Sequence, residues 1–145
     1  MDPSDFADMV TAYLECMLWS TPTMSDEDCE DLTYDRAGCT VSDCTREVVA
    51  LARRDCRGFL SVVADKSPEA LAEVNADPSQ AGHDLWLTAE GHGAGFWDGD
   101  WTNGRILTDC SRHFTIADEI YLTRQGKGAS QRAAYNRRIR ARKVA

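Results

Sequence analysis

Apolar side chains follow helical spacing in two long segments of the chain. From Phe6 to Leu18 they recur every three or four positions after a plausible cap at Ser4, and the pattern ends shortly before Pro22. From Val48 to Val63 they recur again, after a Thr40-x-x-Asp43 pattern that resembles a capping box. These two segments therefore predict two long amphipathic helices.

Two proline-containing pairs predict further helix starts. Ser67-Pro68 places a capping serine before a proline at the first helical position, which predicts a third helix. Asp77-Pro78 repeats this signal, and we expect it to make a single turn that ends at Gly82.

The segment that follows alternates polar and apolar residues, as a half-buried strand does. Residues 84–88 and 93–97 read as two strands, and Glu90-Gly91-His92 supplies the turn of a β-hairpin. A helix capped by Thr102 or Asn103 follows, and residues 119–122 read as a third strand. The predicted fold is α+β, with several helices packed on a small antiparallel sheet built around this hairpin.

The expected strand pairing determines the candidate chemistry of the hairpin. His83 would face Asp98 at the open end, whereas His92 lies at the turn, roughly 20 Å away for six residues of extended chain. The two histidines therefore cannot share a metal ion, and we predict no metal site there. The His83–Asp98 pair leaves two alternatives open, a tie between strand ends or a general base with its orienting carboxylate.

One face of the expected sheet carries large aromatic side chains. If no helix covers that face, it is a candidate partner surface. Its predicted contact residues are Trp86, Thr88 and Trp97, with His92 at the turn. The chain shows no cofactor motif, and we expect its cysteines to be free thiols. A zinc site or a disulfide among Cys29, Cys39 and Cys44 stays an alternative.

Charge divides the chain into two parts. The first 120 residues hold 24 acidic and 8 basic residues, a net charge of −16, whereas the last 25 hold eight basic residues and no acid. We therefore expect one acidic domain over residues 1–123 and a basic tail over residues 124–145. The tail is a candidate arm for nucleic acid, with a solubilising role or docking on the acidic body as alternatives. Its candidate contacts are Arg132, Arg137, Arg138, Arg140, Arg142 and Lys143.

Apolar runs in this chain are short. None approaches the ~20 residues that span a bilayer, and the acidic start lacks the basic and apolar regions of a signal peptide. We therefore expect a cytoplasmic protein that does not enter a membrane.

The segment at 81–98 also carries a resemblance. With Gly99 included, it stands as AGHDLWLTAEGHGAGFWDG and resembles a family of small phage, plasmid and actinobacterial proteins whose members have a segment close to AGHDFWLTRNGHGAGFWDR. The resemblance extends more weakly over most of residues 13–121. It implies a bacteriophage or mobile-element origin and carries no activity with it, so no catalytic residue is transferred.

Three functions are weighed on these grounds. The leading one is a non-enzymatic bacteriophage accessory protein in the host cytoplasm, which binds a host or phage macromolecule and thereby inhibits a host process or defence system. The second is a nucleic-acid-binding protein that uses the basic tail. The third is a small hydrolase or transferase that uses His83 and Asp98.

Overall fold

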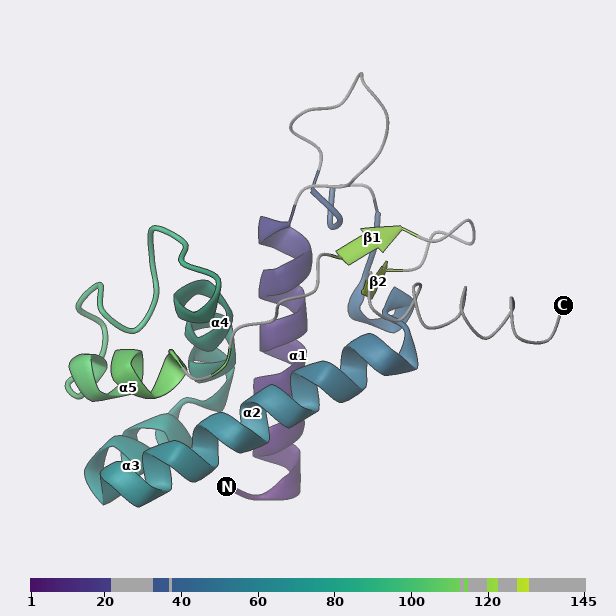
Figure 1. Cartoon of the computed structure of the whole chain (residues 1–145). Helices are drawn as coiled ribbons and strands as arrows, with labels where there is room; N and C mark the ends of the chain where they lie inside the picture. Colours follow the sequence, from purple (N-terminus) through teal and green to yellow (C-terminus); the bar gives the residue numbers. More distant parts are fainter. Residues whose placement is uncertain (22–32, 37, 113, 115–119, 123–127, 131–145) are drawn as a thin grey trace, which may run out of the picture.

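The computed structural model describes residues 1–21, 33–36, 38–112, 114, 120–122 and 128–130. Two long helices, α1 (Pro3–Ser20) and α2 (Arg46–Lys66), cross one another, and α4 (Pro78–Ala89) lies along α1 (Figure 1). Two shorter helices, α3 (Pro68–Ala76) and α5 (Gly104–Ser111), pack on the same end of α2. A 3-10 turn, η1 (Val41–Asp43), precedes α2.

Side-chain caps begin α1, α2, α3 and α4, and the caps of α3 and α4 are the ones that the sequence predicts. Asp2, rather than Ser4, caps α1 by accepting hydrogen bonds from two backbone amides. The capping box of Thr40 and Asp43 is present, but it begins η1, and Thr45 caps α2. Ser67 caps α3 as expected.

The predicted α+β fold is wrong, because the segment read as a hairpin is mostly helix. Asp77-Pro78 starts a full helix, α4, which runs through Gly82 to Ala89, so residues 84–88 are helical. Residues 93–97 form no strand but part of an irregular connection to α5. The fold is therefore helical, and no sheet lies under the helices in the described part of the chain.

The strand expected at 119–122 is present as β1 (Ile120–Leu122), but its partner differs. It pairs antiparallel with β2 (Gly128–Ser130), Tyr121 opposite Ala129, in a ribbon of three residues each. Its partner is therefore β2 and not a strand of the hairpin predicted at 84–97.

The core of the described residues lies where α1, α2 and α4 meet. Tyr13 and Leu14 of α1, Phe59 of α2 and Leu85 of α4 are buried there. The α1 and α4 backbones touch at Gly82, where a Cβ atom would lie 2.0 Å from the Met9 carbonyl oxygen. Only glycine permits this approach, which explains a helical glycine that the sequence suggests is a helix end.

Within the part of the chain that the structure describes, no helix is both long and apolar enough to cross a bilayer.

Gly82→Ala should test this contact. The added methyl group collides with backbone that cannot turn away, so we expect the free energy of unfolding to fall by about 3 kcal/mol. Urea unfolding followed by circular dichroism measures the change. Gly93→Ala is the matched control, because a Cβ atom there meets nothing within 4 Å. Equal stability of the two variants would contradict the proposed constraint.

Candidate functional site

The segment at 81–98 comprises the end of α4 and the start of the connection that leads to α5, and several hydrogen bonds join these two parts. The helix ends in a Schellman motif, in which the His92 amide donates to the Leu87 carbonyl at 2.9 Å and the Gly91 amide to the Thr88 carbonyl at 3.2 Å. Gly91 has a φ of +72°, which glycine adopts without strain. The turn that the sequence predicts at Gly91 therefore exists, but it ends a helix.

The connection then folds back onto α4. The Phe96 amide donates to the Thr88 hydroxyl at 3.0 Å, and the Phe96 ring stacks on Phe59 of α2 with centroids 5.3 Å apart. Asp98 accepts a hydrogen bond from the Gly95 amide at 3.1 Å. Thr88 is thus an internal support of the connection rather than part of a partner surface.

A buried carboxylate, Asp84, fastens the far end of the connection. Its Oδ2 atom accepts hydrogen bonds from Trp101 Nε1 at 2.7 Å and from Gln80 Nε2 at 2.9 Å. Its Oδ1 atom lies 3.1 Å from Nδ1 of His83, and only 2% of Asp84 is exposed. Because an ionised carboxylate only accepts hydrogen bonds, this contact favours the His83 tautomer that carries its proton on Nδ1.

Trp86 belongs to the core and not to an exposed face. It is 3% exposed, its ring meets Tyr13 edge-on, and its Nε1 donates to the Ser20 hydroxyl at 2.7 Å. Tyr13 in turn donates to the buried carboxylate of Asp55 at 3.0 Å. Burial and the nearby Asp55 charge raise the pKa of Tyr13 well above its usual value, so the phenol keeps its proton and the hydrogen bond.

Two tryptophans do not contribute to the core. Trp19 is 57% exposed and Trp97 is 55% exposed. Trp19 stacks on His83, with ring centroids 6.2 Å apart and planes inclined by 29°. Trp19 and His92 also line a hollow of about 390 Å³ whose other residues are Ser20, Leu87, Gly93 and Ala94. We call Trp19, His83 and His92 the aromatic edge.

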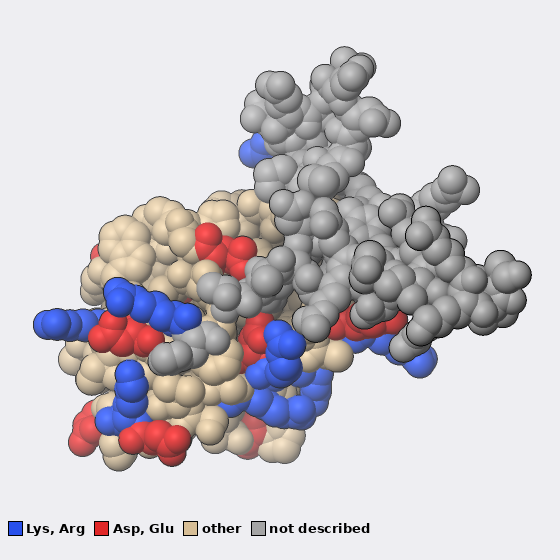
Figure 2. Space-filling model, in the orientation of Figure 1, with Lys and Arg blue, Asp and Glu red and all other residues tan. Residues whose placement is uncertain are grey.

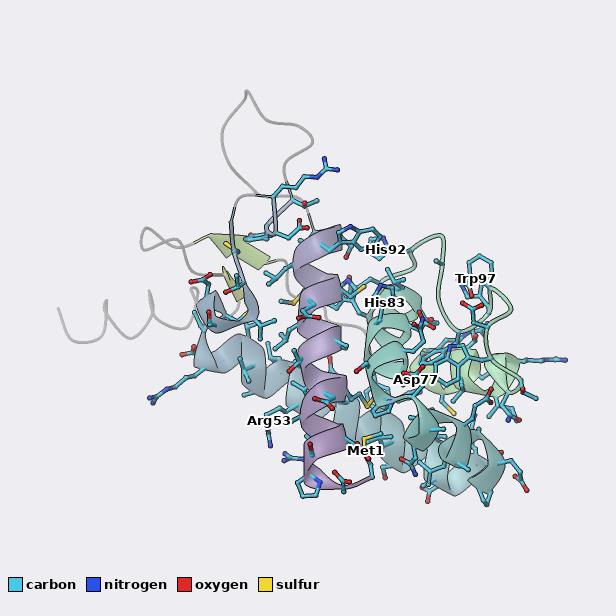
Figure 3. All side chains as sticks on the ribbon, turned by 180° about the vertical axis from the view of Figure 1, so that it is seen from behind. Met1, Arg53, Asp77, His83, His92 and Trp97 are labelled. Carbon is cyan, nitrogen blue, oxygen red and sulfur yellow. The ribbon has the colours of Figure 1, made fainter. Side chains whose placement is uncertain are left out.

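Figure 3 shows how these residues are arranged. His83 lies midway along α4, His92 lies just beyond the end of this helix, and Trp97 points outward from the connection that follows. Of the four predicted partner residues, His92 and Trp97 are exposed, Thr88 is half-buried and Trp86 is buried.

The predicted His83–Asp98 pair has lost the strand pairing on which it was based. His83 contacts Asp84, its neighbour in the chain, and Asp98 contacts the Gly95 amide. Asp98 is exposed, whereas the carboxylate beside His83 is buried. The hydrolase or transferase hypothesis built on this pair therefore has no geometric basis here.

Burial affects the thiols of Cys39 and Cys44. Burial raises the pKa of Cys44 to about 11 and raises that of Cys39 as well, so both keep their protons at neutral pH. In the described ranges no group of three or more His, Cys, Asp or Glu residues could hold a metal ion. Cys29 and the six candidate tail contacts, Arg132, Arg137, Arg138, Arg140, Arg142 and Lys143, lie outside the described residues.

Sequence reasoning missed Trp19 and Asp84. Trp19 stands at the end of an amphipathic helix, and that position gave no sign of the imidazole on which it stacks. Asp84 was assigned to a strand, which hid its i, i+4 relation to Gln80. No family model, curated protein or solved structure matches this chain, so its function is argued from its own residues.

Asp84→Ala should measure how strongly the connection is fastened. The substitution leaves the buried Trp101 indole N–H without an acceptor, and we expect a loss of about 3 kcal/mol in the free energy of unfolding. Urea unfolding gives the value, and Asp98→Ala is the exposed-carboxylate control with a much smaller expected loss. Similar losses in both variants would show that Asp84 is not the main support.

Glu73 of α3 holds the start of α5, and its contribution should depend on pH. It accepts hydrogen bonds from the Asn103 amide and side chain, both at 2.9 Å, and from the Thr102 amide. Partial burial raises the pKa of Glu73, but these hydrogen bonds outweigh it and lower the pKa below the usual 4.5. A lowered folded-state pKa means stabilisation that is complete above the unfolded-state pKa and is lost as the pH falls through the folded-state value.

Glu73→Gln should therefore reduce stability at pH 7 and matter less in acid. We expect wild type to exceed the variant by about 1 kcal/mol at neutral pH, with the gap closing as the pH falls below 4.5 and through the lowered folded-state pKa. Thermal or urea unfolding across this range measures the gap. A gap that does not change with pH would contradict the role of the charged carboxylate.

Proposed function

We propose that this protein is a non-enzymatic binding protein that contacts a protein partner through the aromatic edge. The observation that carries this proposal is the exposure of Trp19, at 57%, beside a hollow with an apolar floor. Leu87 and Ala94 supply that floor, and His83 supports the Trp19 ring from below. A rigidly held tryptophan next to a small hollow is typical of the anchor residues that dominate protein interfaces.

The support under this edge favours recognition over accidental exposure. His83 is held by the buried carboxylate of Asp84, which is itself held by Gln80 and Trp101. The ring on which Trp19 stacks is therefore kept in one orientation, and less side-chain entropy is lost when a partner binds.

Charge narrows the class of partner. The first 120 residues carry a net charge of −16, which attracts a basic protein surface at long range and repels other acidic chains. We therefore propose a basic partner that inserts an apolar side chain into the hollow. A bacteriophage origin, the host cytoplasm as location and inhibition of a host process rest on the sequence resemblance and stay predictions.

A cross-linking experiment with competitors tests this proposal. A photo-reactive amino acid in place of exposed His92 should join the protein to one discrete partner in lysate of the cells that carry its gene. Excess wild-type protein and excess Trp97→Ala should both suppress this product, because both keep the aromatic edge. Excess Trp19→Ala should suppress it at least about tenfold less well, the loss expected for one anchor residue.

Two results would overturn the proposal. The first is the absence of a discrete product from position 92. The second is equal suppression by Trp19→Ala and Trp97→Ala, when circular dichroism shows that both variants are folded.

A further inference from the structure

A second cavity, separate from the aromatic edge, lies between the connection and α5. Its volume is about 440 Å³, within the range of small-molecule sites. Trp97 stands on one side with 55% of its surface exposed, and the buried rings of Phe96 and Trp101 lie deeper. The first turn of α5 contributes Gly104 and Arg105. We call this the Trp97–Arg105 cavity.

Positive charge gathers at this cavity in an otherwise acidic body. The first 120 residues contain only eight basic side chains, and two of them, Arg105 and Arg112, line the cavity. Arg105 lies in the first turn of α5 and Arg112 caps its C-terminal end, seven residues later, which places them on one side of the helix roughly 10 Å apart along its axis. Figure 2 shows basic side chains over α5 at the left edge of this face, with acidic ones between them.

The two guanidinium groups differ in whether they form an ion pair with the described residues. Arg112 pairs with Asp109, another cavity residue, at 3.7 Å, and both side chains are well exposed. Arg105 makes no ion pair with any of the described residues. Arg105 is therefore the principal candidate to bind an anion, and the helix dipole adds favourable potential at the first turn of α5.

The geometry points to a binding site for a small planar aromatic molecule that carries a phosphate group. The ring of such a ligand stacks on the exposed Trp97 indole, and its phosphate accepts hydrogen bonds from the Arg105 guanidinium. Thr102 lines the same cavity and supplies a hydroxyl group for a polar atom of the ligand. The Thr108 hydroxyl also lines the cavity, but it donates to the Gly104 carbonyl at 2.7 Å and can only accept a hydrogen bond from the ligand. A nucleoside monophosphate and phosphotyrosine share this chemistry.

Charge and size favour a small ligand over a polyanion. A long nucleic acid strand would meet the net charge of −16 that the first 120 residues carry together, whereas a single phosphate meets chiefly the two arginines. The carboxylate of Asp109 lowers the affinity of the cavity for a phosphate group, because it repels the phosphate and already pairs with Arg112. Removing that carboxylate should therefore strengthen binding, which no general loss of structure would do.

Isothermal titration of the full chain with AMP and with free phosphotyrosine tests the site. We expect at least one of the two to bind, and adenosine and inorganic phosphate, which each lack half of the ligand, to bind at least about tenfold more weakly. Arg105→Gln and Trp97→Ala should each weaken binding about tenfold. Asp109→Asn should strengthen it several-fold.

Two matched variants serve as controls. Arg46→Gln removes an equally exposed arginine on α2, and Trp19→Ala removes the other exposed tryptophan, so neither should change the affinity. Because Trp19 carries the proposed protein contact and Trp97 this site, either proposal can fail alone. Binding of neither AMP nor phosphotyrosine, or equal affinities of Arg105→Gln and Arg46→Gln, would overturn the inference.

Discussion

The contact between Gly82 and the backbone of Met9 determines how α1 and α4 lie, and most of the molecule depends on it. Because no side chain separates the helices there, their remaining side chains interlock closely along both. The buried Trp86 thereby reaches the Ser20 hydroxyl and the edge of Tyr13. The same approach brings Trp19 of α1 over His83 of α4, so one packing constraint produces both a core and an exposed aromatic surface.

The second dependence runs from α4 to the connection that follows it. Thr88 accepts a hydrogen bond from the Phe96 amide, and Asp84 accepts one from the Trp101 indole. Gly91 ends α4 with its positive φ, so residues in and just after α4 determine the path of the connection to α5. This explains why residues 81–98 are so dense in glycine, aromatic and polar side chains. Most of them support the fold, and the exposed His92 and Trp97 contribute to the two proposed binding surfaces.

The sequence predicted helix starts well because a cap is a local interaction. Ser67-Pro68 and Asp77-Pro78 both begin helices as their residue types require. The hairpin prediction failed because α4 is buried on more than one side, by α1 and by the connection, so its buried residues show no single helical stripe. Over five residues such a helix cannot be distinguished from an alternating strand. The positive φ expected at Gly91 is real, but a helix end needs it as much as a hairpin does.

Candidate site residues were harder to predict, because their roles depend on contacts between distant elements. His83 was expected to pair with Asp98, but the carboxylate that it contacts is Asp84, and the difference follows from helix replacing strand. Asp84 also connects the aromatic edge with the Trp97–Arg105 cavity. One of its oxygens orients His83 under Trp19, and the other holds Trp101, which lines the Trp97–Arg105 cavity. A single buried carboxylate thus supports both the aromatic edge and the Trp97–Arg105 cavity, because one oxygen of Asp84 contacts His83 and the other accepts a hydrogen bond from Trp101.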